Sequence, residues 1–323
     1  MTAGGRPGCA AGAAAVPMPP CSRRAVLLRG LVLVLVPHGL RSASPSGARR
    51  GPPPPGVRVT LVPPGPHPGD VVLVRVAGAP SEARLEWDGH PLALFPTDTG
   101  SAALIGVDLD RPAGPVGWRV LAPAGQVTAP LATGTVRLRA RTFPVQRLTL
   151  PPAVVDLDPA TLARVDAERA ALQAALADSA PERLWRGPFR PPVEGARPTG
   201  GFGLRRLING QPRSPHTGYD WAAPVGTPVA AANAGRVALV AEHFFAGRNV
   251  VLDHGLGLFT LYFHLDEIRV AASEAVAAGQ VIGTVGATGR VTGPHLHFGV
   301  LLGGARVDPE TLLALPLPAE AAS

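Results

Sequence analysis

The sequence has 323 residues, enough for two ordinary domains, and all 30 of its basic residues are arginine, which gives a formal net charge of +7. The arginines are scattered along the chain rather than gathered in one block, and this distribution argues against a nucleic-acid-binding protein. Both cysteines, Cys9 and Cys21, lie within an expected targeting segment, so the mature chain has no thiol for a disulfide, a nucleophile or a metal site.

Residues 1–45 are predicted to be a targeting segment. Arg23 and Arg24 precede a short apolar run that ends at Val36, and small residues follow it, as in a secretory signal. The run is shorter than the roughly 20 apolar residues of a membrane span, and Arg29 interrupts it. We therefore expect export to the periplasm, the cell envelope or the medium, by the general or the twin-arginine route, with no stable membrane span after cleavage. A retained N-terminal anchor is the alternative.

Residues 46–56 are rich in proline and glycine, which predicts a linker. In the next segment, residues 57–150, apolar side chains recur at every second position in short runs bounded by turn residues. Seven or eight strands at this spacing predict a β-sandwich of immunoglobulin-like type in a mainly β protein. The clearest runs are 57–61, 71–76, 83–87, 91–95, 102–107, 118–121 and 136–141. His67 and His90 lack ligand-spaced neighbours and are interpreted as surface residues.

Residues 151–195 predict a short helical connector. Asp158 is a favourable N-cap, Pro159 suits the first helical position, and apolar residues from Leu162 to Leu176 recur at helical spacing. We expect this helix to be a spacer or a packing strut.

The remaining segment, residues 196–310 with a tail at 311–323, contains six of the nine histidines, all between His216 and His297. His216 and Asp220 are four residues apart, and both are good zinc ligands, although this spacing alone is a weak motif. His264 lies in a run of alternating residues and is expected on the less apolar face of a strand.

His295 and His297 are two residues apart in a predicted strand, so both imidazoles should lie on one face while Leu296 and its alternating neighbours enter the core. Paired imidazoles on a rigid strand favour metal binding or acid–base chemistry. The other two histidines of the cluster, His243 and His254, are interpreted as structural.

At this point the sequence resembles the lysostaphin-type zinc endopeptidases, also called beta-lytic metallopeptidases. The resemblance covers residues 196–310, in which the matching pieces occur in family order. These pieces are FGLRR (202–206), HTGYD (216–220), AAPVGTPVAAANAGRV (222–237), NVVLDHG (249–255), LYFHL (261–265), GQVIGTVGATGRVTGPHLHF (279–298) and VDP (307–309). The resemblance implies a small antiparallel β-sheet domain with a metal in a groove across it.

The resemblance also implies the site. His216, Asp220 and His297 match the three ligands of one Zn²⁺ ion, and His264 and His295 match two unliganded catalytic histidines. The implied activity is hydrolysis of peptide cross-links in bacterial peptidoglycan by metal-activated water.

Two further residues, Arg205 and Tyr262, could line the groove and contact substrate, although a structural ion pair is equally compatible with Arg205. The alternatives to an active enzyme are a non-catalytic regulator of cell-wall hydrolases and a latent enzyme whose first domain or helix covers the groove. The sequence leaves open which histidine is the base and which peptide bond is cut.

Overall fold

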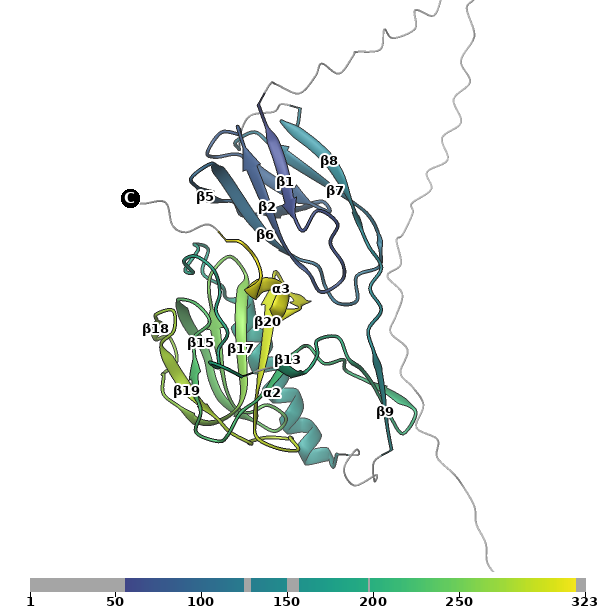
Figure 1. Ribbon diagram of the computed structural model, residues 1–323, viewed down its shortest axis with the longest axis vertical. Helices are drawn as coiled ribbons and strands as arrows, with labels where there is room; N and C mark the ends of the chain where they lie inside the picture. Colours follow the sequence, from purple (N-terminus) through teal and green to yellow (C-terminus); the bar gives the residue numbers. More distant parts are fainter. Residues whose placement is uncertain (1–55, 125–128, 150–156, 197, 318–323) are drawn as a thin grey trace, which may run out of the picture. The chain divides into compact units, whose positions relative to one another are not determined.

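A computed structural model describes residues 56–124, 129–149, 157–196 and 198–317. The expected targeting segment and nearly all of the expected linker lie outside these residues. The described part is built mainly from β-strands, as Figure 1 shows. No helix within it is long and apolar enough to cross a membrane.

The N-terminal strands form two four-stranded antiparallel sheets whose apolar side chains pack on each other. Val72, Val74 and Ile105 from one sheet share a buried cluster with Leu85 and Val120 from the other. This two-sheet packing is the expected sandwich, and its immunoglobulin-like type stays a prediction. In order across each sheet the strands are β1 (Arg58–Val62), β2 (Val71–Ala77), β6 (Gly100–Gly106) and β5 (Phe95–Thr97), and β4 (His90–Leu92), β3 (Arg84–Trp87), β7 (Gly114–Leu121) and β8 (Ala132–Leu138).

The expected strand at residues 91–95 is two strands. β4 ends at Leu92 and pairs with β3, whereas β5 begins at Phe95 and pairs with β6 in the other sheet. The residues between them carry the chain from one sheet to the other, a change of layer that an unbroken apolar run does not reveal.

A ten-stranded sheet dominates the C-terminal part, and all its pairings are antiparallel. Its main order is β10 (Pro198–Gly200), β13 (Gly218–Ala222), β20 (His295–Leu302), β17 (Leu258–Ile268), β16 (Gly247–Asp253), β15 (Gly235–His243) and β18 (Ala275–Val276). Three further strands flank it: β14 (Pro228–Ala230), β19 (Val281–Val285) and β21 (Ala305–Val307). A small separate sheet joins β12 (Gln211–Arg213), β11 (Arg205–Ile208) and β9 (Val145–Leu148), with β9 parallel to β11.

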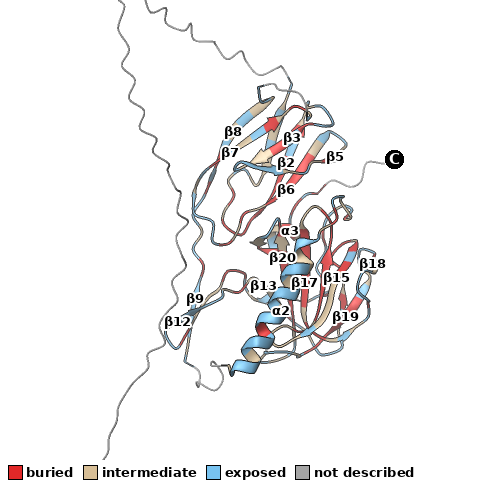
Figure 2. Cartoon of the chain, turned by 180° about the vertical axis from the view of Figure 1, so that it is seen from behind, coloured by how far each residue is buried: buried red, intermediate tan, exposed pale blue. Residues whose placement is uncertain are grey.

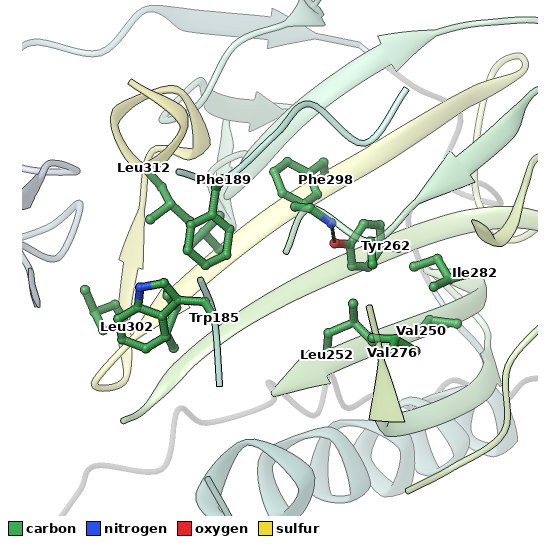
Figure 3. Close-up of a cluster of buried hydrophobic side chains, with 14 of the residues drawn as sticks. Trp185, Phe189, Val250, Leu252, Tyr262, Val276, Ile282, Phe298, Leu302 and Leu312 are labelled. Carbon is green, nitrogen blue, oxygen red and sulfur yellow. Dashed lines mark hydrogen bonds between the residues drawn. The ribbon is translucent and has the colours of Figure 1, made fainter. Parts of the chain in front are cut away.

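One face of the large sheet covers the main apolar core, which Figure 3 shows around Trp185, Phe189, Tyr262 and Phe298. The core extends into the N-terminal sandwich, because the rings of Phe95 and Trp185 meet edge to face with centroids 5.5 Å apart. Such pairs stabilise packing beyond their buried area.

Helix α2 (Pro159–Ala177) begins as the sequence predicts. The side chain of Asp158 accepts hydrogen bonds from the backbone N–H groups of Ala160 and Thr161, and Pro159 is the first helical residue. Leu172 and Leu176 pack on the second face of the sheet, while most of the helix surface is exposed (Figure 2). The helix therefore lies against the sheet as a packing strut.

Two expected domain boundaries need correction. Helix α3 (Pro309–Leu313) spans the boundary expected at residue 310, and Leu312, Leu315 and Leu317 are buried in the core, so the C-terminal domain continues to the last described residue. At the other end, Trp185 belongs to the same core although it lies in the expected connector. Composition alone does not reveal which short segments fold back onto a sheet.

His254 is buried in this core, which agrees with its predicted structural role. Its Nδ1 lies 2.8 Å from the Ala234 carbonyl oxygen, and its Nε2 lies 2.7 Å from Thr260 Oγ1. Burial lowers the pKa of His254 to about 4. Below about pH 6.5, His254 is therefore protonated in the unfolded chain, whereas in the folded chain it becomes protonated only below about pH 4.

We expect stability to fall as the pH drops from 6.5 towards 4, with His254 contributing about 3 kcal/mol of that loss at most. Denaturant unfolding at pH 7 and pH 5 measures the loss. The variant His254→Gln cannot take up this proton, so its stability should depend less steeply on pH. An unchanged slope in the variant would assign the effect to other groups.

Candidate metal and active site

The three expected metal ligands come from two neighbouring strands. Asp220 on β13 and His297 on β20 stand directly opposite each other in the antiparallel register, and Figure 1 shows β13 and β20 side by side. His216 lies just before β13, where its backbone N–H donates to the Leu204 carbonyl oxygen at 3.0 Å. The strand pairing and this loop contact together bring the three side chains to one place.

The ligand atoms of these residues converge. His216 Nε2 lies 2.9 Å from Asp220 Oδ1 and 3.1 Å from His297 Nδ1, and Asp220 Oδ1 lies 2.9 Å from His297 Nδ1. His216 and His297 are nearly buried, whereas the Asp220 side chain is 22% exposed. The structure thus brings the three residues together.

This convergence favours a bound cation. His216 Nδ1 lies 2.9 Å from the Gly201 carbonyl oxygen, which can only accept, so Nδ1 carries the proton and Nε2 of the neutral ring is bare. A bare nitrogen facing a carboxylate oxygen is repelled unless a second proton or a metal cation lies between them. Histidine ligands commonly donate their other N–H to a backbone carbonyl, as His216 does here. The donor set therefore fits a metal ion.

The charge state of the site agrees with this. Burial alone would raise the pKa of Asp220, but its hydrogen bonds with His216 and His297 outweigh burial and hold that pKa well below its usual range. Burial also lowers the pKa of His297, although Asp220 partly opposes the change. A carboxylate anion that lies between the His216 and His297 imidazoles is a good receptor for a divalent cation.

Close approach of the strands also depends on one glycine. A Cβ atom at Gly218, in the HTGYD segment, would lie 2.8 Å from His297 Nε2 and 2.4 Å from the Phe298 carbonyl oxygen. Any other residue at this position would displace the ligand strand.

The two expected catalytic histidines lie beside the ligand group. The rings of His264 and His295 have centroids 4.8 Å apart, and His295 Nε2 is 3.7 Å from Asp220 Oδ1. His264 Nδ1 lies 3.0 Å from the Thr288 carbonyl oxygen, and His295 Nδ1 lies 2.8 Å from that of Gly293. Each carbonyl fixes a proton on Nδ1, so each neutral ring offers a bare Nε2 that can accept a proton.

His264 reaches the site through an unusual backbone conformation. Its φ angle is +67°, in the left-handed region that non-glycine residues seldom adopt. Phe263 already stands opposite His297 and stacks on its ring at 5.4 Å, so regular alternation would send His264 to the other face. The left-handed conformation of His264 turns its imidazole back to the side of the metal ligands. Burial and, to a smaller extent, the charge of His297 lower the pKa of His264 to about 4.

The structure corrects the expected groove positions of Arg205 and Tyr262. Arg205 pairs with Asp110 at 2.6 Å, which is the structural ion pair that the sequence left open. Tyr262 is fully buried on the core face, where its Oη accepts a hydrogen bond from the Ala232 N–H at 2.9 Å. Its alternation with Phe263 places it on the face opposite the metal ligands.

Three other contributors to the site could hardly be recognised from sequence: Phe263, which stacks on a ligand, and the carbonyl groups of Thr288 and Gly293. The glycine-rich approach to His295 is the one signal that could have indicated them. A loop that curls around the histidines needs such turns in order to aim its carbonyls inward.

Comparison with known proteins agrees with this geometry. The sequence profile of peptidase family M23 matches residues 214–309. A crystal structure from Pseudomonas aeruginosa, described as a peptidase M23, is 30% identical and superimposes with a TM-score of 0.61 over 77% of this chain and 95% of that one. The chain belongs to peptidase family M23.

Two relatives are similar to part of this chain. The peptidoglycan DD-endopeptidase ShyC of Vibrio cholerae is 42% identical over 126 residues, which are 38% of this chain and 29% of that protein. The DD-carboxypeptidase/endopeptidase Mpg of Neisseria meningitidis is 39% identical over 133 residues, which are 37% of this chain and 30% of that protein. The alignments thus span less than a third of either relative.

Proposed function

We propose that this M23 protein is a zinc-dependent endopeptidase that hydrolyses peptide cross-links of bacterial peptidoglycan. The observation that carries the proposal is the convergence of His216, Asp220 and His297 beside two histidines whose Nε2 atoms are bare. The names of the two relatives, a peptidoglycan DD-endopeptidase of Vibrio cholerae and a DD-carboxypeptidase/endopeptidase of Neisseria meningitidis, support peptidoglycan as the substrate.

His216, Asp220 and His297 would hold the zinc ion, because two imidazoles and a carboxylate are ligands that zinc accepts. When bound there, zinc would supply Lewis acidity and make water a nucleophile near neutral pH.

The unliganded histidines move protons. One of His264 and His295 takes a proton at Nε2 as water attacks the scissile carbonyl, and the other stabilises the developing oxyanion or returns a proton to the leaving amine. The carbonyls of Thr288 and Gly293 hold the rings in the required tautomer. Both residues remain candidates for the base.

The organisation of the chain suits work outside the cytoplasm. Residues 1–45 direct export to the periplasm or cell envelope and residues 46–56 form a linker. Residues 57–150 and the C-terminal part, whose core begins at Trp185, are then two modules joined by the segment that carries helix α2.

The test incubates purified protein lacking residues 1–45 with isolated peptidoglycan and zinc. We expect mass spectrometry to identify fragments released by cleavage of one type of peptide bond, and a chelator should stop their release. Zinc in excess should restore it. If the folded, zinc-loaded protein releases nothing, the enzymatic proposal is wrong and a regulatory role takes its place.

A further inference from the structure

Two arginines face the same side of the small sheet beside the site. Arg206 on β11 and Arg213 on β12 are direct partners in the antiparallel register, so their side chains project from one face. Like charges directly opposite each other destabilise a strand pair. The repulsion between the two arginines therefore destabilises the hairpin, and a bound anion could offset this destabilisation.

This arginine pair lies at the end of the hairpin nearest the metal ligands. β12 ends at Arg213, shortly before His216, and β11 follows Leu204, whose carbonyl oxygen accepts the His216 N–H at 3.0 Å. The Gly203 N–H also donates to the His216 carbonyl oxygen at 2.8 Å. These backbone contacts fix the base of the hairpin against the ligand loop.

A third arginine approaches from the loop that holds the catalytic histidines. Arg290 follows Thr288, the residue whose carbonyl oxygen meets His264 Nδ1. The Arg290 guanidinium lies 4.3 Å from the centre of the Phe245 ring, and its backbone N–H donates to the Phe245 carbonyl oxygen at 3.1 Å. Stacking of this kind holds a guanidinium in place while its edge stays open to a ligand.

None of the three arginines has a carboxylate partner within the described ranges, whereas Arg205 and Arg306 nearby both form ion pairs. Arg290 lies two residues after Thr288, whose carbonyl oxygen meets His264, and the base of the hairpin contacts His216, so Arg290 and the arginine pair flank the same group of histidines. The lowered pKa of Arg290, caused by burial and then by the charges of Arg206 and Arg213, is consistent with this placement. The three charges have no carboxylate counter-ion among the described residues.

We propose that Arg206, Arg213 and Arg290 form an anion-binding rim that recognises free carboxylates of the peptide substrate. The identity of that substrate as a peptidoglycan peptide rests on the proposed function. Guanidinium groups bind carboxylates through two parallel hydrogen bonds, which fixes orientation as well as affinity. The rim would thus select peptides whose carboxylates are free over those in which they are amidated.

The test measures binding without turnover. The full chain, stripped of metal with a chelator, is titrated by calorimetry with a synthetic stem peptide bearing free carboxylates and with the same peptide fully amidated. Because one charged hydrogen bond is worth roughly a tenfold change in affinity or more, we expect the wild type to prefer the acid form by at least about tenfold. Higher salt should shrink that preference.

The triple variant Arg206→Gln, Arg213→Gln, Arg290→Gln should lose the preference. The single variant Arg290→Gln should lose part of the preference for the acid peptide. Because Arg290 lies at an exposed loop position, this variant can test the rim if the triple variant does not fold. The matched control is Arg147→Gln on β9, because Arg147 pairs in register with Leu207 and so belongs to the opposite face of the same sheet.

Equal binding of both peptides, no measurable binding of the acid form, or a preference retained by the variants would overturn the rim. Cleavage of peptidoglycan by the zinc-loaded wild type is scored separately. If the protein prefers the acid peptide but cleaves no peptidoglycan, the proposed function is contradicted and the anion-binding rim is supported. If it cleaves peptidoglycan but binds both peptides equally, the proposed function is supported and the rim is contradicted.

Discussion

Replacing His297 by alanine is expected to abolish metal binding and, with it, cleavage of peptidoglycan. The variant removes one of three ligand atoms and leaves only His216 and Asp220 in the ligand group. Loss of a residue that merely supports a ligand commonly weakens metal affinity roughly 10- to 100-fold, so loss of the ligand itself should cost at least about 100-fold. Metal content after gel filtration and fragment release from peptidoglycan measure the two effects.

The matched control is His243→Ala. His243 ends β15 opposite Gly247, is partly exposed and lies outside the ligand group. This variant should bind one zinc per chain and cleave at the wild-type rate. If His297→Ala retained stoichiometric zinc and normal cleavage, the assignment of the ligand set would be wrong.

The strand that carries His295 and His297 could be predicted from sequence in detail. Leu296, Phe298 and Val300 are fully buried in the core, and the two histidines face the other side. A strand with one apolar and one polar face admits only one register, because a slip of one residue would exchange the two faces. Simple alternation therefore located this part of the site.

Alternation failed on β17, where both faces are apolar. Thr260 and Tyr262 are fully buried on the core face, and Phe259 and Leu261 are buried beneath helix α2. A strand of this kind has no less apolar face on which to place His264. The left-handed backbone at His264 that brings its ring to the ligands leaves no mark in the residue pattern.

The choice between neighbouring arginines also needed the structure. Arg205 and Arg206 are equivalent in sequence, but Asp110 in the N-terminal part of the chain neutralises Arg205. Arg206 instead stands opposite Arg213 without a described carboxylate. Contacts between segments this far apart in sequence cannot be inferred from local periodicity, and they decide which arginine is available to a ligand.

Removing the imidazole of His264 should leave the metal in place and stop the chemistry. We expect His264→Ala to keep one zinc per chain, because His264 supplies no ligand atom to the His216, Asp220 and His297 group. Its kcat should fall by roughly 100- to 10,000-fold, the usual contribution of a positioned acid or base, with a small change in KM. Metal analysis and steady-state cleavage of a synthetic cross-linked peptide measure both.

A second variant, His264→Gly, separates the imidazole from the backbone that carries it. Glycine adopts the left-handed conformation without a Cβ penalty, so this variant should be more stable than His264→Ala by up to about 1 kcal/mol while losing the same activity. Thermal unfolding compares the two variants. If glycine restored activity that alanine lost, the function of this position would lie in the shape of the strand. Equal loss of activity with unequal stability would assign the chemistry to the ring, and the left-handed backbone would then be the means by which the fold positions it.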